Sequence, residues 1–241
     1  MKWSVSARRS AYVALLRLLE QRNDLDGMDT LHARRVEEYG AGCYAAEYAG
    51  FKLHQRHDAQ GAIDVARSGL NGACADRPSR QILGLASYAK WAESNGAEAA
   101  DALNQGRAFL PAGPRLLHLL ASHDSTLPAA KKLVADGENV DQKDNDGMTA
   151  LALALQGDEL DAAQRLLDLG AGLETPVTTG NIPVALLPVM DGNYPAIALL
   201  RRAGVDYSKL RYRGQTAVEL VKEAVNDAAL LEAMVGADNT R

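Results

Sequence analysis

The segment GMTALALALQGDELDAAQRLLDLGAG, from Gly147 to Gly172, decides the fold of the C-terminal half of this chain. Its leucines and alanines recur at helical spacing in two runs that a short polar stretch separates. Gly170 closes the second run, and glycine is the residue that most often follows a helix end, where a left-handed backbone is needed. The segment therefore predicts a helical hairpin, with a first helix after Thr149 and a second helix that ends at Gly170.

The same pattern returns at a nearly constant interval. Equivalent segments begin at glycines spaced 34, 33 and 34 residues apart: Gly113, Gly147, Gly180 and Gly214. A second set of glycines follows the leucine-rich helices at the same interval: Gly137, Gly170 and Gly204. Two sets of glycines with the same spacing indicate a structural repeat. In such a repeat each helix pair covers the apolar face that its neighbour cannot bury alone.

These copies resemble the ankyrin repeat, a turn followed by two antiparallel helices, with a TPLH motif at the first helix start and LL..G at the second helix end. The stretches that match the TPLH motif are Thr149–Ala152, Ile182–Ala185, Thr216–Glu219 and, more loosely, Arg115–His118. The resemblance is closest over residues 146–204 and extends over 113–241. It implies about four stacked repeats with turn fingers along one side, and it makes protein binding the expected function.

Single residues explain parts of this pattern. Thr149 and Thr216 stand where a hydroxyl can accept a hydrogen bond from the first backbone N–H groups of a helix. The closing glycines stand where a left-handed residue is required. In the third copy, Pro188 and Pro195 flank the turn between the two helices, so we expect shorter helices there.

The N-terminal half, residues 1–112, shows helical apolar spacing without a clean period. It predicts helices near residues 9–22, 30–57, 59–70, 79–95 and 97–109. Residues 45–111 weakly resemble the tetratricopeptide repeat, in which small residues let paired helices approach closely. The residues at such positions here are Gly50, Ala62, Gly69, Ala99, Gly106 and Pro111. We therefore expect an all-α chain, an α-solenoid of stacked helical hairpins with the ankyrin repeats in its C-terminal half.

Composition narrows the class of protein. Apolar residues make up 47% and charged residues 24% of the 241 residues, as in globular proteins. The basic and then apolar N-terminus is interrupted by Arg17 and Glu20, so we expect no signal peptide, and no run of about 18 apolar residues predicts a membrane span. Two cysteines cannot form a disulfide framework, which favours a reducing, cytoplasmic location.

The charge is unevenly distributed. Residues 1–112 hold 14 basic and 13 acidic residues, whereas residues 113–241 hold 12 and 18, a net charge of −6. This balance argues against a nucleic-acid partner and favours a basic protein partner for the C-terminal half.

The stretch DQKDNDG, Asp141–Gly147, is rich enough in carboxylates and amides to suggest a calcium loop. Such a loop needs glycine at position 6 and glutamate at position 12. With Gly147 at position 6, position 12 is Leu153, which has no carboxylate. We interpret the stretch as a tight turn in which Asp144, Asn145 and Asp146 bond their own backbone.

Other chemistry-bearing residues have no visible partners. His54 and His57 lack a third metal ligand, so we interpret them as solvated or packing residues. His118 occupies the histidine position of the TPLH motif, where the resemblance implies a structural role. Cys43 and Cys74 have no defined histidine partner. We therefore expect no cofactor, no metal, no small-molecule substrate and no enzymatic activity, with an unrecognised catalytic site as a remote alternative.

The three full turn fingers differ in chemistry: the acidic finger Asp141–Gly147, the neutral finger Glu174–Asn181 and the mixed finger Asp206–Gly214. Tyrosine and arginine dominate the energetics of protein interfaces, and the mixed finger interleaves them. We predict a partner-binding surface made of Asp144, Asn145, Asp146, Thr179, Asn181, Tyr207, Lys209, Arg211, Tyr212 and Arg213. The alternative is that these are solvated loops.

The sequence thus predicts a non-catalytic protein-binding module without nucleic-acid or membrane partners. A sharper hypothesis is an immunity protein of ankyrin type, because small bacterial ankyrin proteins often resemble proteins that bind and neutralise a toxin. An acidic array would suit a basic, nuclease-like toxin bound one to one, since complementary charge speeds capture. A general adaptor or scaffold is the alternative, and the sequence leaves open the partner, the binding face and the oligomeric state.

Overall fold

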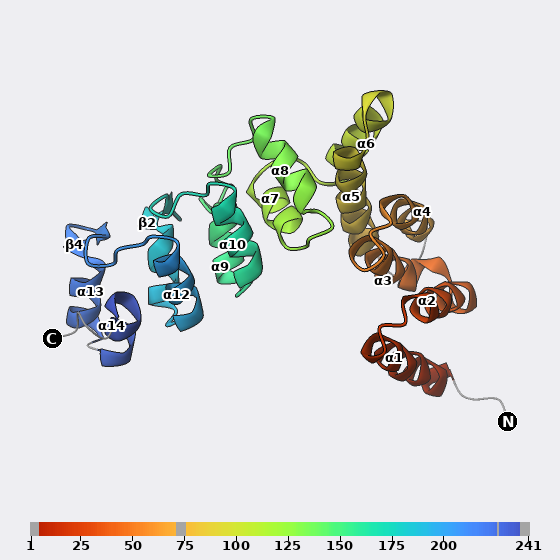
Figure 1. Cartoon of the computed structure of the whole chain (residues 1–241), viewed down its shortest axis with the longest axis horizontal. Coiled ribbons are helices and arrows are strands. Elements are labelled where there is room, and N and C mark those ends of the chain that lie inside the picture. The colour runs from red at the N-terminus through yellow and green to blue at the C-terminus, as the bar shows by residue number, and fades with distance from the viewer. Residues whose placement is uncertain (1–4, 71–75, 226, 237–241) are drawn as a thin grey trace. The chain divides into compact units, whose positions relative to one another are not determined.

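The computed structural model describes residues 5–70, 76–225 and 227–236. Within these ranges the chain is mostly helical, with fourteen α-helices, one 3₁₀ helix and two two-stranded hairpins (Figure 1). The predicted all-α class is confirmed. Each described helix is too short or too polar to cross a lipid bilayer.

The chain folds as two compact units. Unit 1 contains the described residues up to Pro111 together with Asp124–Ala129, and unit 2 contains Ala112–His123 and the described residues from Ala130 onward. The short later segment of unit 1 is joined to its third helix through His54, whose Nδ1 lies 2.8 Å from Oγ of Ser125.

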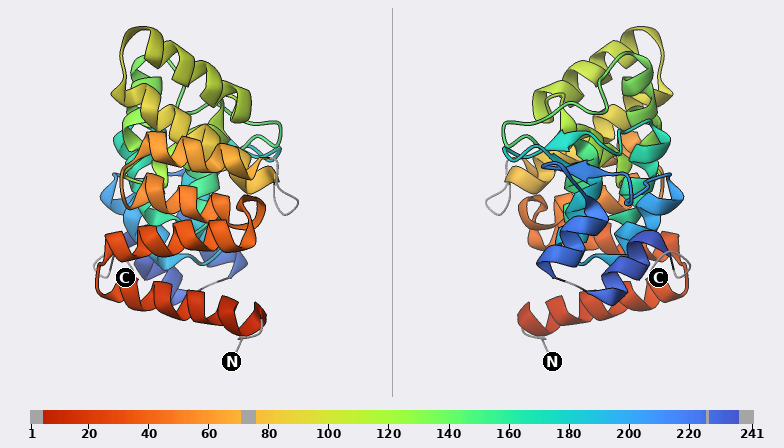
Figure 2. Two further views of the ribbon diagram at one scale, coloured as in Figure 1. Left: turned by 90° about the vertical axis from the view of Figure 1, so that its right-hand side faces the viewer. Right: turned by 90° about the vertical axis from the view of Figure 1, so that its left-hand side faces the viewer.

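Unit 1 is built from six helices that pack against their neighbours in sequence. They are α1 Val5–Gln21, α2 Leu25–Tyr39, α3 Ala41–His54, α4 Ala59–Gly69, α5 Asp76–Glu93 and α6 Gly96–Phe109. Figure 2 shows the first four, from red to orange, as successive rows. Met28, Tyr48 and Phe51 form the buried cluster that ties α2 to α3, and Leu16 and Leu19 of α1 pack against it.

The prediction of one helix over residues 30–57 is wrong. The helix ends at Tyr39 and a new one begins at Ala41, because Gly40 adopts φ 86° and ψ 148°, outside the helical region. Apolar spacing continues through Gly40 on both sides, so periodicity alone did not reveal the break. The turn folds α3 back onto α2, and this places residues of the two helices side by side.

Glycines allow helices in unit 1 to approach closely. A Cβ on Gly69 of α4 would lie 2.8 Å from Cβ of Ala45, and one on Gly106 of α6 would lie 2.9 Å from Cδ2 of Tyr88. Both distances are too short for a real side-chain carbon, so the expected close approach is confirmed at these two positions. Gly50 differs, since its nearest contact would be Cδ1 of Ile82 at 3.9 Å.

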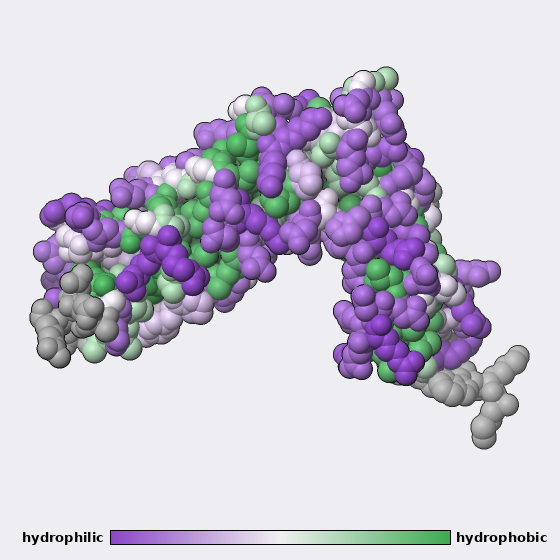
Figure 3. Space-filling view, viewed as in Figure 1, coloured by the Kyte–Doolittle hydropathy of each residue, from purple (hydrophilic) through white to green (hydrophobic). Residues whose placement is uncertain are grey.

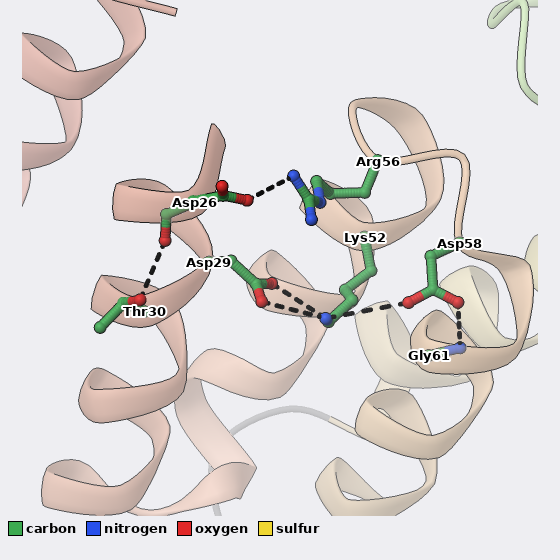
Figure 4. A network of polar contacts seen from close by, with 7 residues as sticks. All are labelled: Asp26, Asp29, Thr30, Lys52, Arg56, Asp58 and Gly61. Carbon is green, nitrogen blue, oxygen red and sulfur yellow. Dashed lines mark hydrogen bonds and ion pairs between the residues drawn. The ribbon is translucent and has the colours of Figure 1, made fainter. Parts of the chain in front are cut away.

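A charged network joins α2, α3 and the start of α4 (Figure 4). Nζ of Lys52 lies 2.9 Å from Oδ1 of Asp29 and 3.8 Å from Oδ2 of Asp58. Asp58 also caps α4, because its Oδ1 accepts the backbone N–H of Gly61 at 2.7 Å. At the edge of the network, Arg56 pairs with Asp26 at 2.8 Å. Every member has a local partner, so we assign this cluster a structural role.

Unit 2 consists of short helix pairs separated by loops. Its helices are α7 Pro114–Ala121, α8 Leu127–Ala135 (in unit 2 from Ala130), α9 Ala150–Gln156, α10 Leu160–Asp168, α11 Leu187–Met190, α12 Tyr194–Arg202, α13 Ala217–Ala224 and α14 Ala228–Val235. Strands β1 Pro176–Val177 and β2 Ile182–Pro183 form one hairpin, and β3 Arg211–Tyr212 and β4 Gln215–Thr216 form the other.

The predicted helix signals of unit 2 are confirmed. Oγ1 of Thr149 accepts the N–H of Ala152 at 3.2 Å. Thr216 forms a capping box, in which its hydroxyl accepts the N–H of Glu219 and the Glu219 carboxylate accepts the N–H of Thr216. The closing glycines, Gly137, Gly170 and Gly204, have φ of 102°, 94° and 108°.

The third copy has the expected short first helix. A 3₁₀ turn, η1 Val184–Leu186, leads directly into the four residues of α11, with Pro188 in its first turn. The missing N–H of Pro188 costs nothing there, because the first N–H groups of a helix have no partner within the helix. Its side chains from Val184 to Val189 are all buried, so this short element still supplies core to unit 2.

Candidate functional site

The three fingers lie on one side of the helix pairs of unit 2, because each connects the end of a second helix to the start of the next first helix. They are hydrogen-bonded to one another in sequence. The N–H of Thr178 in the neutral finger donates to the carbonyl of Gly147 at 3.0 Å. The hydroxyl of Tyr212 in the mixed finger donates to the carbonyl of Gly180 at 3.2 Å. The fingers therefore form one connected surface.

The acidic finger contains a turn that is held by the side chain of Asp144. Oδ1 of Asp144 accepts the N–H of Asp146 at 3.0 Å and that of Met148 at 2.8 Å. Asp144 is half-buried, whereas Asn145 and Asp146 are exposed. The predicted tight turn is confirmed for Asp144, whose carboxylate is engaged within the chain. Asn145 and Asp146 present the polar groups that a partner can reach.

The neutral finger includes β1 and ends in the four-residue loop that leads to β2. Thr178 and Asn181 have φ of 61° and 51°, a conformation that asparagine tolerates and that lets the chain reverse. Thr179 and Asn181 are exposed at this loop, as the prediction requires. The side chains of Thr179 and Asn181 are uncharged, so these two residues add hydrogen-bonding groups but no charge to the surface.

The mixed finger ends in a tight hairpin between β3 and β4. Arg213 and Gly214 have φ of 51° and 88°, the signs that a two-residue type I′ turn requires. Nη2 of Arg211 donates to the carbonyl of Gly214 at 2.9 Å, and the guanidinium of Arg213 lies 5.0 Å from the centroid of the Tyr212 ring. Arg211 and Arg213 are both exposed and supply the positive charge of the finger.

Tyr207 does not belong to this surface, and the prediction that it contacts a partner is wrong. It is 1% exposed, and its hydroxyl donates to the carbonyl of Ala185 at 3.2 Å. Burial raises the pKa of the Tyr207 phenol above its ordinary value. Tyr207 is therefore a core residue of unit 2, bonded to the backbone of η1.

Lys209 is exposed, but its charge is paired locally. Its Nζ lies 2.8 Å from Oδ2 of Asp206. The hydrogen bond from Lys209, followed by that from Ser208, lowers the pKa of Asp206 to about 2. Asp206 stays ionised at neutral pH and offsets Lys209, so the two arginines carry the net charge of the mixed finger.

A groove that was not predicted from the sequence lies on the other side of the helix pairs, where the α9–α10 and α11–α12 turns meet. Its volume is about 560 Å³, and it is lined by Leu155, Gln156, Asp158, Leu160, Asp191, Gly192, Asn193, Tyr194 and Pro195. Asp191 is exposed, and Asp158 accepts a hydrogen bond from Nδ2 of Asn193. Tyr194 is 42% exposed. The lining contains two carboxylates and no cationic side chain.

A signal for this groove was present in the repeat. Asp158 and Asp191 are 33 residues apart, which is the repeat spacing between Gly147 and Gly180. Residues at equivalent positions of adjacent copies lie next to each other in a stacked repeat. Each aspartate alone is an ordinary turn residue. Only their equivalent positions in adjacent copies predict that the two negative charges lie close together.

The remaining sequence candidates have structural surroundings. Nε2 of His118 lies 3.2 Å from Oε2 of Glu159 in unit 2, as expected for a structural histidine. His57 is exposed, with φ of 52°. Within the described residues, no three His, Cys, Asp or Glu side chains lie close enough together to hold a metal ion. Cys74 and the side chain of Cys43 lie outside the described part of the structure.

Comparison with known proteins gives no family: no family model matches the chain, and no curated protein matches it significantly.

Proposed function

We propose that unit 2 is an ankyrin-repeat array within an α-solenoid, and that it binds a protein partner without catalysis. Support comes from features at equivalent positions of the copies: the helix-capping threonines of the second and fourth copies, the left-handed closing glycines and the hydrogen-bonded fingers. An array of this kind offers a long rigid surface in which neighbouring copies place different side chains side by side. Two parts of that surface are available: the exposed finger residues and the acidic groove.

The acidic groove is the observation that favours a basic partner. Asp158 and Asp191 line it with two carboxylates, and no lysine or arginine lies among its lining residues. Beside them, Tyr194 presents a partly exposed ring. Carboxylates select and orient a cationic side chain, and an aromatic ring supplies contact area at a small cost in rotamer entropy. An arginine or lysine at the centre of a partner interface fits this combination.

The sharper proposal is an immunity protein that neutralises a basic, nuclease-like toxin as a 1:1 complex in the cytoplasm. The net charge of −6 over residues 113–241 would attract such a toxin and accelerate its capture. A toxin that cleaves nucleic acid needs cations at its own active site, so an acidic groove is complementary to the part that must be blocked.

A general adaptor or scaffold is the second candidate, and the mixed finger favours it. Arg211 and Arg213 are exposed there, and they fit an acidic partner better than a basic one. An adaptor that offers both an acidic groove and a basic finger would bind several proteins with moderate affinity, whereas an inhibitor would bind one protein tightly.

The experiment that separates these candidates begins with the product of the gene adjacent to the one that encodes this chain. The two proteins are co-expressed, the stoichiometry of the complex is measured by light scattering, and the activity of the neighbour is assayed with and without the chain. A tight 1:1 complex with loss of activity supports the immunity proposal. A neighbour that keeps its activity when bound would refute the inhibitor and leave the adaptor.

Two charge reversals locate the contact. Asp191→Lys places a cation in the groove, and Glu232→Lys makes the same charge change on the exposed side of α14. If the groove holds the partner, Asp191→Lys weakens binding by at least about tenfold, and Glu232→Lys changes it by less than about threefold. Equal losses in the two variants would mean that only the overall charge of unit 2 matters.

A further inference from the structure

Unit 1 contains a groove of the opposite charge. It lies between α1 and the α2–α3 hairpin and has a volume of about 370 Å³. It is lined mainly by Arg9, Val13, Ala14 and Arg17 of α1, Arg35 of α2 and Tyr44 of α3. Three guanidinium groups thus face one groove, and no carboxylate is among the lining residues.

Two of these arginines are unpaired. Arg9 and Arg17 are exposed, and neither forms an ion pair with a carboxylate of the described residues. The guanidinium of Arg9 lies 5.7 Å from the centroid of the Tyr39 ring. Cations on helices are commonly paired with a nearby carboxylate, so two unpaired arginines at one groove leave a charge that a ligand can neutralise.

The third arginine is buried and incompletely bonded. The Arg35 side chain is 9% exposed, its Nη1 lies 2.7 Å from Oε1 of Glu47, and its guanidinium lies 4.2 Å from the centroid of the Tyr44 ring. Nε of Arg35 is buried and has no hydrogen-bond partner among the described residues. This N–H is enclosed by the chain, so Arg35 forms part of the groove wall with Tyr44, and the free positive charge comes from Arg9 and Arg17.

Apolar side chains separate the charges. Arg9, Val13 and Arg17 follow one another at intervals of four residues, so they lie on one face of α1. Val13 is 41% exposed. Figure 3 shows hydrophobic residues in green at the surface of this end of unit 1, among hydrophilic ones. The groove therefore offers an apolar contact between cationic ones.

We propose that this groove binds an acidic segment of a partner protein, with carboxylates on Arg9 and Arg17 and an apolar side chain against Val13. A guanidinium group can bind a carboxylate bidentately and can also lie over a tyrosine ring, and the second of these contacts is already present between Arg35 and Tyr44. Nucleic acid fits less well, because three arginines make a short track for a phosphate backbone and the chain carries a net charge of −5.

This site is independent of the proposed function of unit 2. The two grooves lie in different units, have opposite charge and select opposite partners. A chain with both could hold a basic protein through one unit and an acidic segment through the other.

The test uses the full chain and a labelled peptide of about 12 residues, three helical turns, that alternates pairs of glutamate and leucine. A matched peptide carries glutamine in place of glutamate. Binding is measured by fluorescence anisotropy at low salt. We expect saturable binding of the glutamate peptide that weakens as salt is added, and binding at least tenfold weaker for the glutamine peptide.

Two variants localise the binding. Arg17→Glu reverses a charge in the groove, and Arg77→Glu makes the same change at an exposed position in the first turn of α5, where helix dipoles favour a carboxylate. Both are expected to keep the circular dichroism of the wild type. Arg17→Glu should weaken binding of the glutamate peptide at least tenfold, and Arg77→Glu less than twofold. Asp191→Lys of unit 2 should not weaken it.

Several outcomes overturn the proposal. Equal effects of Arg17→Glu and Arg77→Glu would mean non-specific attraction, and equal affinity for the glutamine peptide would mean apolar contact alone. Tighter binding of a single-stranded oligonucleotide than of the peptide, lost in Arg17→Glu, would assign the groove to nucleic acid. A wild-type dimer that Arg17→Glu dissociates would assign it to a second copy of this chain.

Discussion

Replacing Tyr207 by alanine is expected to destabilise unit 2 strongly, although this tyrosine sits in a finger. Its ring is 1% exposed, and its hydroxyl donates to the carbonyl of Ala185 at 3.2 Å. Removing a buried aromatic ring leaves a cavity and typically costs about 3–5 kcal/mol. Tyr207→Phe keeps the ring and loses only the hydrogen bond, which contributes about 0.5–1.5 kcal/mol. The two substitutions therefore separate packing from hydrogen bonding at one position.

The assay should report on unit 2 alone, because a chain of two compact units need not unfold in a single two-state step. Hydrogen exchange of the full chain, followed by mass spectrometry on peptides from α11 to α14, does this. Every 1.4 kcal/mol changes an equilibrium constant tenfold, so Tyr207→Ala should increase exchange-competent opening by roughly a hundredfold to a few thousandfold. Tyr207→Phe should increase it by about two- to tenfold.

Lys209→Ala is the matched control within the same finger. The Lys209 side chain is 84% exposed, and exposed substitutions usually change stability by less than about 0.5 kcal/mol. If the hydrogen exchange of Tyr207→Ala equalled that of Lys209→Ala, the conclusion that Tyr207 is a buried core residue would be refuted. A binding test of the mixed finger should leave Tyr207 in place and change Arg211 or Arg213, because a folding defect would otherwise imitate a lost contact.

Two further predictions concern unit 1. Burial lowers the pKa of His32 below 6.5, so the unfolded chain binds the proton first and the free energy of unfolding should fall as pH drops from about 6.5 toward the folded-state pKa. Urea unfolding at pH 7.5 and 5 should show a smaller loss in His32→Phe than in the wild type, and equal losses would contradict this assignment. Gly69→Ala should cost about 1–3 kcal/mol because its Cβ would lie 2.8 Å from that of Ala45. Gly50→Ala, in an open helix interior, should instead stabilise by up to about 1 kcal/mol, and thermal melts of both variants would reveal a wrong sign.

The sequence determined those features that depend on a few neighbouring residues. A hydroxyl at Thr149 or Thr216 caps the helix that follows it, and a glycine at Gly170 or Gly204 permits the left-handed turn that ends one. Because these requirements are local and recur at a fixed interval, they predicted the helical class and the helix pairs of unit 2. The tight turn at Asp144 followed from the same local chemistry.

Only the tertiary structure decided which side chains are buried and which meet. Tyr207 looked like an exposed finger residue because no local signal shows that it is buried and bonded to Ala185 of η1. The break at Gly40 returns α3 along α2 and brings Tyr44 onto Arg35, nine positions apart in the chain. Asp158 and Asp191 share a groove because their two turns pack together. Burial and long-range pairing depend on elements distant in sequence, and periodicity specifies a helix face without specifying what lies against it.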